Sequence, residues 1–522
     1  MALFSARERA FATAVSNLSY CNPFLPERIE HERQALGSAF RQSDAPWNVR
    51  VEMEGVPPNV NRLIRQAESL AEKTRTSLAT GTQAGQQDLA LYEDMVLFLL
   101  FHRYIPQFDG TLPPATREAK RLRLVFYTDF ARDYEHYLTL PKGRPVASHE
   151  LAHMFACFFQ LRRAFHHIFR YLVGASGPAI RLRATVWQSI FTHDMRCYRR
   201  ALYSRMGDIT TLITGPSGTG KELVARAIGL SRYIPFDEKG LAFCEDYAES
   251  FHPINLSALS PTLIESELFG HRKGAFTGAL QDREGWLEVC RPLGTVFLDE
   301  IAETDAAVQV KLLRVLESRV FQRLGDTQPR EFRGKVIAAT NRNMAEEMQA
   351  GRFRADLYYR LCSDIIRTPS LREQLADSPE ELGRLILFLA RRIAGEDEAP
   401  RIAGQVETWI REHLGPDYAW PGNVRELEQC VRNVILRGSY QPAGPRVKDA
   451  GEALAEAMAV GRLTAEELLQ RYCAIVYAKT GSLTETARRL GLDRRTVKAK
   501  IESDADKVAG YTDNRQSGSA TE

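Results

Sequence analysis

A glycine-rich loop that ends in a lysine is the clearest candidate for chemistry in this chain. Residues 215–222 read Gly-Pro-Ser-Gly-Thr-Gly-Lys-Glu, which is the pattern G-x-x-x-x-G-K. Backbone N–H groups of such a loop and the N-terminus of the next helix cradle phosphates, and the lysine reaches the β- and γ-phosphates. We therefore predict an ATP site made by Gly215, Pro216, Ser217, Gly218, Thr219, Gly220, Lys221 and Glu222.

The segments that flank the loop support this interpretation. The β-branched run 208–214 predicts a strand, and residues 223–230 are expected to form a helix. Glu222 stands where a serine or threonine usually binds Mg²⁺, so the metal must depend on a second acidic motif and on water.

An apolar strand that ends in two carboxylates supplies the second acidic motif. Residues 294–300 read Gly-Thr-Val-Phe-Leu-Asp-Glu, as expected of a buried parallel strand. Sheets of parallel strands place ligands at their carboxyl ends. Asp299 is predicted to hold Mg²⁺, and Glu300 is predicted to polarise the attacking water as a general base.

A loop of small residues lies between these two motifs, and its members are Gly274, Ala275, Phe276, Thr277, Gly278 and Ala279. Glycines at both ends allow positive φ and a sharp bend. The loop is therefore expected to present Phe276 and Thr277 to another molecule. In isolation an ordinary surface turn would be the better interpretation, but the flanking ATP machinery favours a functional loop.

This loop, preceded by residues 265–271 (Glu-Ser-Glu-Leu-Phe-Gly-His), resembles the signature loop of the AAA+ activators of sigma-54 RNA polymerase, the bacterial enhancer-binding proteins. The resemblance runs from about Thr210 to Leu436 and resumes near the C-terminus. It implies that the loop touches sigma-54 and moves with the ATP cycle. Pro216 replaces a glutamate common in that family, a departure that we expect to be tolerated.

The same resemblance implies roles for five further residues. Asn255 would hold the catalytic glutamate in its resting position, and Asn341 would sense the γ-phosphate. Arg354 and Arg360 would act in trans on the ATP of a neighbouring subunit. Arg425 would reach back to the nucleotide from the lid. Residues 324–333 are expected to form a second loop that supports the Gly274–Ala279 loop.

The end of the chain predicts a DNA-binding domain. Helices are expected over 464–479 and 483–490, followed by Gly491-Leu492-Asp493 and a final helix to about residue 502, with Asp493 as its N-cap. The pattern resembles the Fis-type helix-turn-helix of sigma-54 activators. The predicted DNA contacts are Arg494, Arg495, Thr496, Lys498 and Lys500. A three-helix scaffold that binds no DNA is the alternative.

Composition excludes few functions. Among 522 residues the net charge is only +3, so DNA binding requires a local basic patch. The eight cysteines form no C-x-x-C pair, which favours a reducing compartment. No signal peptide or membrane-length apolar run is evident, and we expect a cytoplasmic protein.

Residues 1–185 are the least readable part, with helical spacing of apolar residues and proline breaks between segments. We expect a mostly helical regulatory domain. The sequence does not reveal which signal this domain senses, or whether the domain represses or stimulates. His149-Glu150-Leu151-Ala152-His153 matches the zinc motif H-E-x-x-H, but no third ligand follows at a familiar spacing. A core or surface position is the preferred interpretation.

The predicted fold is an α/β AAA+ P-loop ATPase core with a helical lid, a mostly α N-terminal domain and a C-terminal all-α helix-turn-helix. The expected domains are 1–185 (regulatory), 186–375 (ATPase), 376–440 (lid), 441–461 (linker), 462–505 (DNA-binding) and 506–522 (flexible tail).

The predicted function is ATP-driven activation of sigma-54 RNA polymerase from enhancer DNA, by a homo-oligomer that extends from dimers to a hexameric ring. The target genes and the resting oligomeric state are not revealed by the sequence. A AAA+ protein remodeller and an ATP-responsive DNA-binding repressor are the alternatives.

Overall fold

The computed structural model describes residues 3–42, 57–112, 123–140, 144–145, 150–246, 250–442 and 463–501, together with residues 454, 458 and 461. The chain divides into two compact units. The first comprises Met1–His413 with Ala419–Gly438, and the second comprises Leu414–Tyr418 with Ser439–Glu522. No helix in the described ranges is long and apolar enough to span a membrane.

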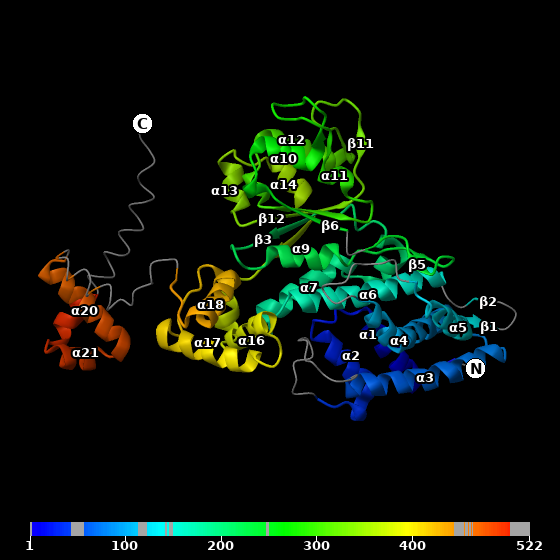
Figure 1. The fold of residues 1–522 in the computed structure, drawn as a ribbon. Coiled ribbons are helices and arrows are strands. Elements are labelled where there is room, and N and C mark those ends of the chain that lie inside the picture. The colour runs from blue at the N-terminus through cyan, green and yellow to red at the C-terminus, as the bar shows by residue number, and fades with distance from the viewer. Residues whose placement is uncertain are drawn as a thin grey trace. The chain divides into compact units, whose positions relative to one another are not determined.

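A five-stranded parallel sheet is the centre of the first unit (Figure 1). Its order is β13-β3-β12-β9-β6, with the pairs all parallel. The strands are β3 (Thr211–Thr214), β6 (Phe251–Asn255), β9 (Thr295–Asp299), β12 (Lys335–Thr340) and β13 (Asp364–Arg367). Because all five run the same way, the residues that follow β3, β9 and β12 meet at one edge of the sheet.

Both faces of the sheet are covered, which explains why the central strands are continuous apolar runs. On one face, side chains such as Val296 and Val336 pack against Leu268, Leu312 and Leu357 from three helices. These helices are α10 (Pro261–Phe269), α12 (Ala306–Ser318) and α14 (Ala355–Leu361).

On the other face, Phe297, Ile213 and Ile337 pack against Val224 and Trp187, from helices α9 and α7. These helices are α9 (Lys221–Gly229) and α7 (Gly177–Phe191), and α13 (Met344–Gln349) follows β12 along the chain.

The N-terminal region is helical, as predicted. Its helices are α1 (Ala6–Tyr20), α2 (Glu27–Leu36), η1 (Gly37–Ala39), α3 (Pro58–Ala79), α4 (Gln86–Thr111), α5 (Tyr127–Leu138) and α6 (Leu151–Tyr171), and α8 (Met195–Cys197) with the π-helical turn η2 (Tyr198–Leu202) follows α7. Two-residue strands pair as β1 (Thr139–Leu140) with β2 (Arg144–Pro145), and β4 (Phe236–Asp237) with β5 (Ala242–Phe243).

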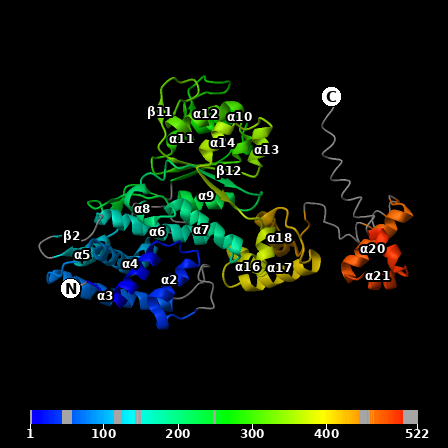
Figure 2. The same ribbon diagram turned by 180° about the vertical axis from the view of Figure 1, so that it is seen from behind.

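Helix α6 joins these N-terminal helices to the ATPase core. Both ribbon views place α6 and α7 between the N-terminal helices and α9 (Figures 1 and 2). The Arg163 guanidinium, 1% exposed, donates to the Leu230 carbonyl oxygen at 3.1 Å. The Gln160 amide donates to the Ser231 carbonyl oxygen at 2.9 Å. Both acceptors lie at the C-terminal end of α9, where helix carbonyls lack intrahelical partners.

The helical lid follows β13 and consists of α15 (Leu371–Asp377), α16 (Glu381–Ala394), α17 (Ala399–His413) and α18 (Asn423–Arg437). The Glu381 side chain is fully buried, and its carboxylate oxygens accept the Ala175 N–H at 2.8 and 3.0 Å. This contact ties α16 to the segment just before α7. The structure thus confirms the predicted α/β P-loop core and its helical lid.

The second unit contains α20 (Ala465–Thr480) and α21 (Leu483–Leu490), and residues 494–501 are also helical. Asp493 caps this last helix as predicted, because its Oδ1 accepts the N–H groups of Arg495 and Thr496 at 2.8 and 3.0 Å. Buried Cys473 and Val497 contribute to the small core of this unit.

Candidate nucleotide site

The predicted phosphate loop is closed by contacts with two other elements. It connects β3 to α9, with φ values of 144° at Gly215, 77° at Gly218 and 87° at Gly220. A Cβ at Gly215 would lie 2.2 Å from Oγ1 of Thr368, and a Cβ at Gly218 would lie 2.2 Å from the Gly422 carbonyl oxygen. Glycine is therefore required here both for positive φ and for close approach.

Lys221 begins α9 and is 7% exposed. Its Nζ donates to the carbonyl oxygens of Gly215 and Pro216 at 3.1 and 3.3 Å, and lies 4.0 Å from Oε1 of Glu300. Burial lowers the pKa of this ammonium, while Glu300 and Asp299 oppose the effect. The lysine is thus a partly desolvated cation with its charge directed at the acidic end of β9.

Asp299 and Glu300 occupy the carboxyl end of β9, as predicted. Burial raises the pKa of Asp299, and the adjacent Glu300 raises it further. Glu300 adopts a left-handed conformation, with φ 55°, and its Oε2 accepts the backbone N–H of Asn341 at 3.2 Å. A short polar bridge therefore joins the ends of β9 and β12, and Asn341 takes part through its backbone.

The lid reaches the phosphate loop through Asn423 and Arg425. The Asn423 side chain is 4% exposed; its Nδ2 donates to the Ser217 carbonyl oxygen at 2.9 Å, and its Oδ1 accepts the Leu371 N–H at 2.9 Å. The Arg425 backbone N–H donates to the Gly218 carbonyl oxygen at 3.3 Å, and its guanidinium lies 3.5 Å from the Ser217 hydroxyl. Arg425 therefore stands beside the loop, where a sensor of nucleotide would be placed.

Thr368, which follows β13, is a site residue that sequence reasoning missed. It is fully buried, and its hydroxyl donates to the Thr214 carbonyl oxygen at 3.2 Å and lies 2.7 Å from the Thr219 hydroxyl. It fixes both ends of the phosphate loop. No local motif identifies Thr368; Asn423, by contrast, belongs to the Trp-Pro-Gly-Asn-Val-Arg-Glu run that drew attention to Arg425.

In the described chain, the side chains of three predicted catalytic residues contact local partners instead of the acidic pair, although Asn255 lies beside Asp299 in the register of β6 and β9. Asn255 is exposed, and its Oδ1 accepts the Ser257 N–H and hydroxyl at 3.0 and 2.8 Å. The expected contact of Asn255 with Glu300 is therefore not made, because a local turn takes up its amide oxygen. Arg354 pairs with Asp356 through 2.6 and 3.0 Å contacts, and Arg360 lies 3.4 Å from Glu317.

Glu222 also turns away from the acidic pair. It is exposed on α9, and its Oε1 accepts two hydrogen bonds from the Arg226 guanidinium at 2.8 and 3.0 Å. This is the i,i+4 geometry of a helix surface pair. Asp299 is therefore the better placed of the acidic residues to hold a metal ion.

The Gly274–Ala279 loop is a closed turn. The Gly274 N–H donates to the Ala279 carbonyl oxygen at 2.8 Å, and the Ala279 N–H donates to the Phe276 carbonyl oxygen at 3.0 Å. Both glycines have positive φ, 81° and 100°, as their positions predicted. Thr277 is exposed. Phe276 was expected to be exposed but is half-buried, because its ring packs edge-on against His271 at 5.0 Å.

Residues 324–333 support this turn, as predicted. The strands β7 (Gly270–His271) and β8 (Arg283–Glu284) flank the loop in sequence, and β10 (Val320–Phe321) pairs with β11 (Arg330–Glu331) on either side of residues 324–329. The Arg272 N–H donates to the Leu324 carbonyl oxygen at 2.9 Å, and the Arg272 guanidinium donates to Asp326 at 3.1 Å. A Cβ at Gly325 would lie 3.0 Å from that of Ala275.

The histidine motif in α6 does not form a metal site in the part of the chain that the structure describes. His149 lies outside the described residues. The His153 ring nitrogens lie 2.9 Å from the Tyr233 hydroxyl and 2.8 Å from the Arg199 carbonyl oxygen, so protein groups occupy both. No group of three His, Cys, Asp or Glu side chains among the described residues could hold a metal ion.

Comparison with known proteins identifies the region that contains both the phosphate loop and the closed turn. Residues 192–367 match the family described as "Sigma-54 interaction domain". This part of the chain is therefore similar to sigma-54 interaction domains. The match begins after α7 and ends with β13, so it covers the whole parallel sheet.

Curated relatives of the sigma-54 interaction domain extend the similarity beyond it. The "Transcriptional regulatory protein ZraR" of Klebsiella oxytoca is 41% identical over 307 residues, which is 56% of this chain and 63% of that protein. The "Nif-specific regulatory protein" of Klebsiella pneumoniae is 43% identical over 234 residues, or 44% of this chain and 40% of that protein. The chain thus spans only part of the length of either relative.

Among solved structures, NtrX from Brucella abortus in complex with ATP is 23% identical. The comparison covers 68% of this chain and 76% of that chain, with a TM-score of 0.38.

The contacts of Thr368 generate a prediction for nucleotide binding. Thr368→Val removes the hydroxyl that joins Thr214 to Thr219, so the phosphate loop is less well ordered before nucleotide binds. Loss of a hydrogen bond of this kind is expected to raise the Kd for ATP about three- to ten-fold, measured by titration with a fluorescent ATP analogue. Thr408→Val, on the exposed surface of α17, should leave the Kd unchanged. Equal Kd values for the two variants would contradict the role assigned to Thr368.

Proposed function

We propose that this protein is an ATP-driven activator of sigma-54 RNA polymerase. The observation that carries the proposal is the placement of Lys221 opposite Asp299 and Glu300, in the same sigma-54 interaction domain as the closed Gly274–Ala279 turn. The charged site can hold and hydrolyse a nucleotide, and the turn can press on a partner protein.

The site fits ATP with Mg²⁺ by the chemistry of its donors. Lys221 and the backbone N–H groups of residues 215–222 would bind the phosphates, and the Asp299 carboxylate would hold the metal, which offsets phosphate charge when bound. Glu300, at 4.0 Å from Lys221 Nζ, would accept the proton of the attacking water. Because Asn341 already donates to Glu300, loss of γ-phosphate could be sensed at the end of β12.

The exposed arginines favour a homo-oligomer, and family resemblance favours a hexameric ring. Arg354, the N-cap of α14, and Arg360, within α14, are both exposed. Each pairs with a carboxylate away from Lys221. Such arginines can complete the ATP site of a neighbouring subunit. An arginine finger neutralises transition-state charge and is worth about a thousand-fold or more in rate.

The Gly274–Ala279 turn is the proposed contact with sigma-54. Thr277 of this turn is exposed and Phe276 is half-buried, and the turn contacts residues 324–333 through Arg272 and Ala275. Hydrolysis at the edge of the sheet would move this turn and remodel the closed promoter complex.

The second unit is the proposed enhancer-binding domain. On the helical residues 494–501, Arg494, Arg495 and Lys498 are exposed. Thr496 and Lys500 were also predicted to contact DNA, but Thr496 contacts Asp493 and Lys500 contacts Glu466. The exposed cations are the ones best placed to reach bases or phosphates.

A protein remodeller remains the second candidate, because a closed turn beside an ATP site could equally grip an unrelated protein. The basic helix in the second unit favours the activator. An ATP-responsive repressor would not need the turn. Whether transcription requires the turn therefore distinguishes the repressor from the activator.

Two substitutions separate ATP hydrolysis from partner contact. Lys221→Ala should reduce ATP hydrolysis by about a hundredfold or more and abolish activation at a sigma-54 promoter, while enhancer binding is retained. Thr277→Ala should retain ATP hydrolysis and enhancer binding but lose activation. ATPase assays, in vitro transcription and gel shifts on the same preparations measure these effects. Thr262→Ala, exposed on α10, is the matched control; full activation by Thr277→Ala would refute the role of the turn.

The basic helix generates a separate prediction. Arg495→Ala should weaken binding to the enhancer, and if Arg495 contacts phosphate the slope of log K against log salt falls by about one. Arg471→Ala, exposed on α20, should leave both the affinity and the slope unchanged. Fluorescence anisotropy with labelled enhancer DNA over a range of salt concentrations distinguishes them. A null effect of Arg495→Ala would exclude this helix face from the DNA interface.

A further inference from the structure

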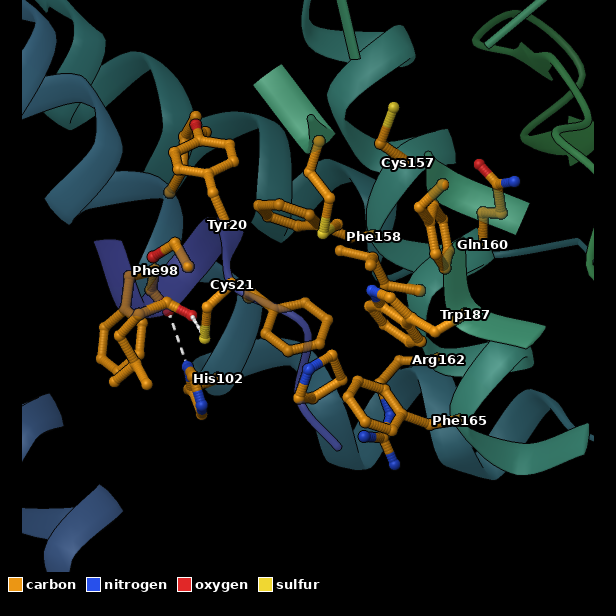
Figure 3. Close-up of a pocket in the computed structure, with 18 of the residues that line it drawn as sticks. Tyr20, Cys21, Phe98, His102, Cys157, Phe158, Gln160, Arg162, Phe165 and Trp187 are labelled. Atoms are coloured by element: carbon orange, nitrogen blue, oxygen red, sulfur yellow. Dashed lines mark hydrogen bonds between the residues drawn. The ribbon is translucent and has the colours of Figure 1, made fainter. Parts of the chain in front are cut away.

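A cavity of about 430 Å³ lies among α1, α4, α6 and α7 (Figure 3). Its volume is within the range of small-molecule sites, which are typically about 300–1,000 Å³. The close-up shows the rings of Tyr20, Phe98, Phe158, Phe165 and Trp187 gathered around one space. None of its lining residues belongs to the phosphate loop or to the acidic pair, so it is separate from the nucleotide site.

The charged groups at its wall already have partners. Arg28 pairs with Glu32 at 3.1 Å, and Arg162 pairs with Asp109 at 2.8 Å. Asp94 accepts from Arg196, outside the wall, at 2.7 Å. The wall's Arg199 lies 3.9 Å from the same Asp94 carboxylate. Because each of these charged side chains lies within ion-pair distance of an opposite charge, the cavity favours a neutral occupant over an ion.

Most of its uncharged polar groups are also used within the protein. The Tyr20 hydroxyl donates to Asp94 at 2.6 Å, and the Tyr198 hydroxyl donates to the side-chain Oε1 of Gln160 at 2.8 Å. The His102 Nδ1 lies 2.9 Å from the Phe98 carbonyl oxygen, and burial lowers the pKa of His102 to about 4. The ring is therefore neutral at pH 7, with Nδ1–H as the donor to Phe98.

Two buried donors of the wall lack a hydrogen-bond partner within the described chain, Nε1–H of Trp187 and Nε–H of Arg199. Trp187 is 2% exposed. A buried donor without an acceptor is costly, and most such groups in folded proteins are satisfied. An acceptor on a molecule inside the cavity would remove this cost.

We propose that the cavity binds a small, neutral, aromatic molecule that carries an oxygen acceptor for the Trp187 indole N–H, and that its occupancy controls ATP hydrolysis. The aromatic wall supplies the contact area, and the indole N–H orients the ligand. This control over ATP hydrolysis rests on the proposed ATPase function, whereas the binding site does not.

Helix α7 links the cavity to the phosphate-loop strand. Trp187 and Phe191 line the cavity. Between them, the Ser189 hydroxyl donates to Asp364 at 2.6 Å, and the same Asp364 oxygen accepts the Thr211 hydroxyl at 3.1 Å. Thr211 begins β3, the strand that leads into the phosphate loop.

Helix α6 provides a second connection. Gln160 is part of the cavity wall, and it accepts from Tyr198 while donating to the Ser231 carbonyl oxygen just beyond α9. A ligand that shifts α7 would therefore act on the start of β3, and one that shifts α6 would act on the end of α9.

The test uses 2-naphthol, which has an oxygen acceptor, and naphthalene, which has none. The full-length protein should bind 2-naphthol saturably in fluorescence anisotropy, and naphthalene should displace it. Trp187→Phe keeps an aromatic ring but removes the N–H, so it should raise the Kd for 2-naphthol about three- to ten-fold and change that for naphthalene less than about twofold. Trp409→Phe, on α17, is the matched control and should bind as the wild type does.

A second variant, Ile105→Trp, fills the cavity from α4 and should abolish binding of both probes, with circular dichroism confirming the fold. Lys221→Ala should bind 2-naphthol as the wild type does. This variant therefore distinguishes a failure of the proposed ATPase function from a failure of the proposed binding site. The proposal is overturned if 2-naphthol shows no saturable binding. It is also overturned if Trp187→Phe and Ile105→Trp leave the binding unchanged. Saturable binding that leaves the wild-type ATPase rate unchanged overturns the control of hydrolysis.

Discussion

The attraction between the Lys221 ammonium and the carboxylates at the end of β9 is the interaction on which the site depends. At 4.0 Å from Glu300, two unit charges attract by about 4 kcal/mol at an effective dielectric of 20, before the cost of desolvating them is subtracted. The opposing pKa effects of burial and of neighbouring charge on Lys221 show the same balance. A triphosphate with its metal ion can bind between these groups, because its phosphates attract the ammonium and its metal ion attracts the carboxylates.

The chain approaches itself closely around the phosphate loop that leads to Lys221. Thr368 lies against Gly215, and Gly422 lies against Gly218, at distances that exclude a Cβ. The carboxyl end of β13 and the start of α18 therefore form two walls of the loop. Since the lid and the loop are in direct contact, a nucleotide that displaces the loop would also act on the lid.

The sequence predicted those features of the site that depend on the local pattern of residues. The phosphate loop, the acidic end of β9, the positive φ of Gly274 and Gly278 and the N-cap at Asp493 each follow from residue types at fixed spacing. The support of the closed turn by residues 324–333 is likewise confirmed. These features depend on backbone conformation and on the common direction of parallel strands.

The features that the sequence did not predict depend mostly on packing between segments that are distant in the chain. Thr368 reaches the phosphate loop only because β13 lies beside β3, and nothing near Thr368 in sequence reveals this. Asn255 is drawn to Ser257 by a local turn. The aromatic cavity requires α1 to lie near α7, although their residues are far apart in the chain. Pairing of distant amphipathic helices cannot be derived from one sequence by periodicity alone.

The central claim is that each ATP site is built from two copies of the chain, with Lys221 from one and Arg354 from the other. Mixing Lys221→Ala protein with Arg354→Ala protein tests it most directly, by the rate of ATP hydrolysis. Each variant alone should be inactive, and the mixture should recover a measurable fraction of the wild-type rate, because some boundaries then combine an intact Lys221 with an intact Arg354. A mixture as inactive as its components, or full activity of Arg354→Ala alone, would contradict the account.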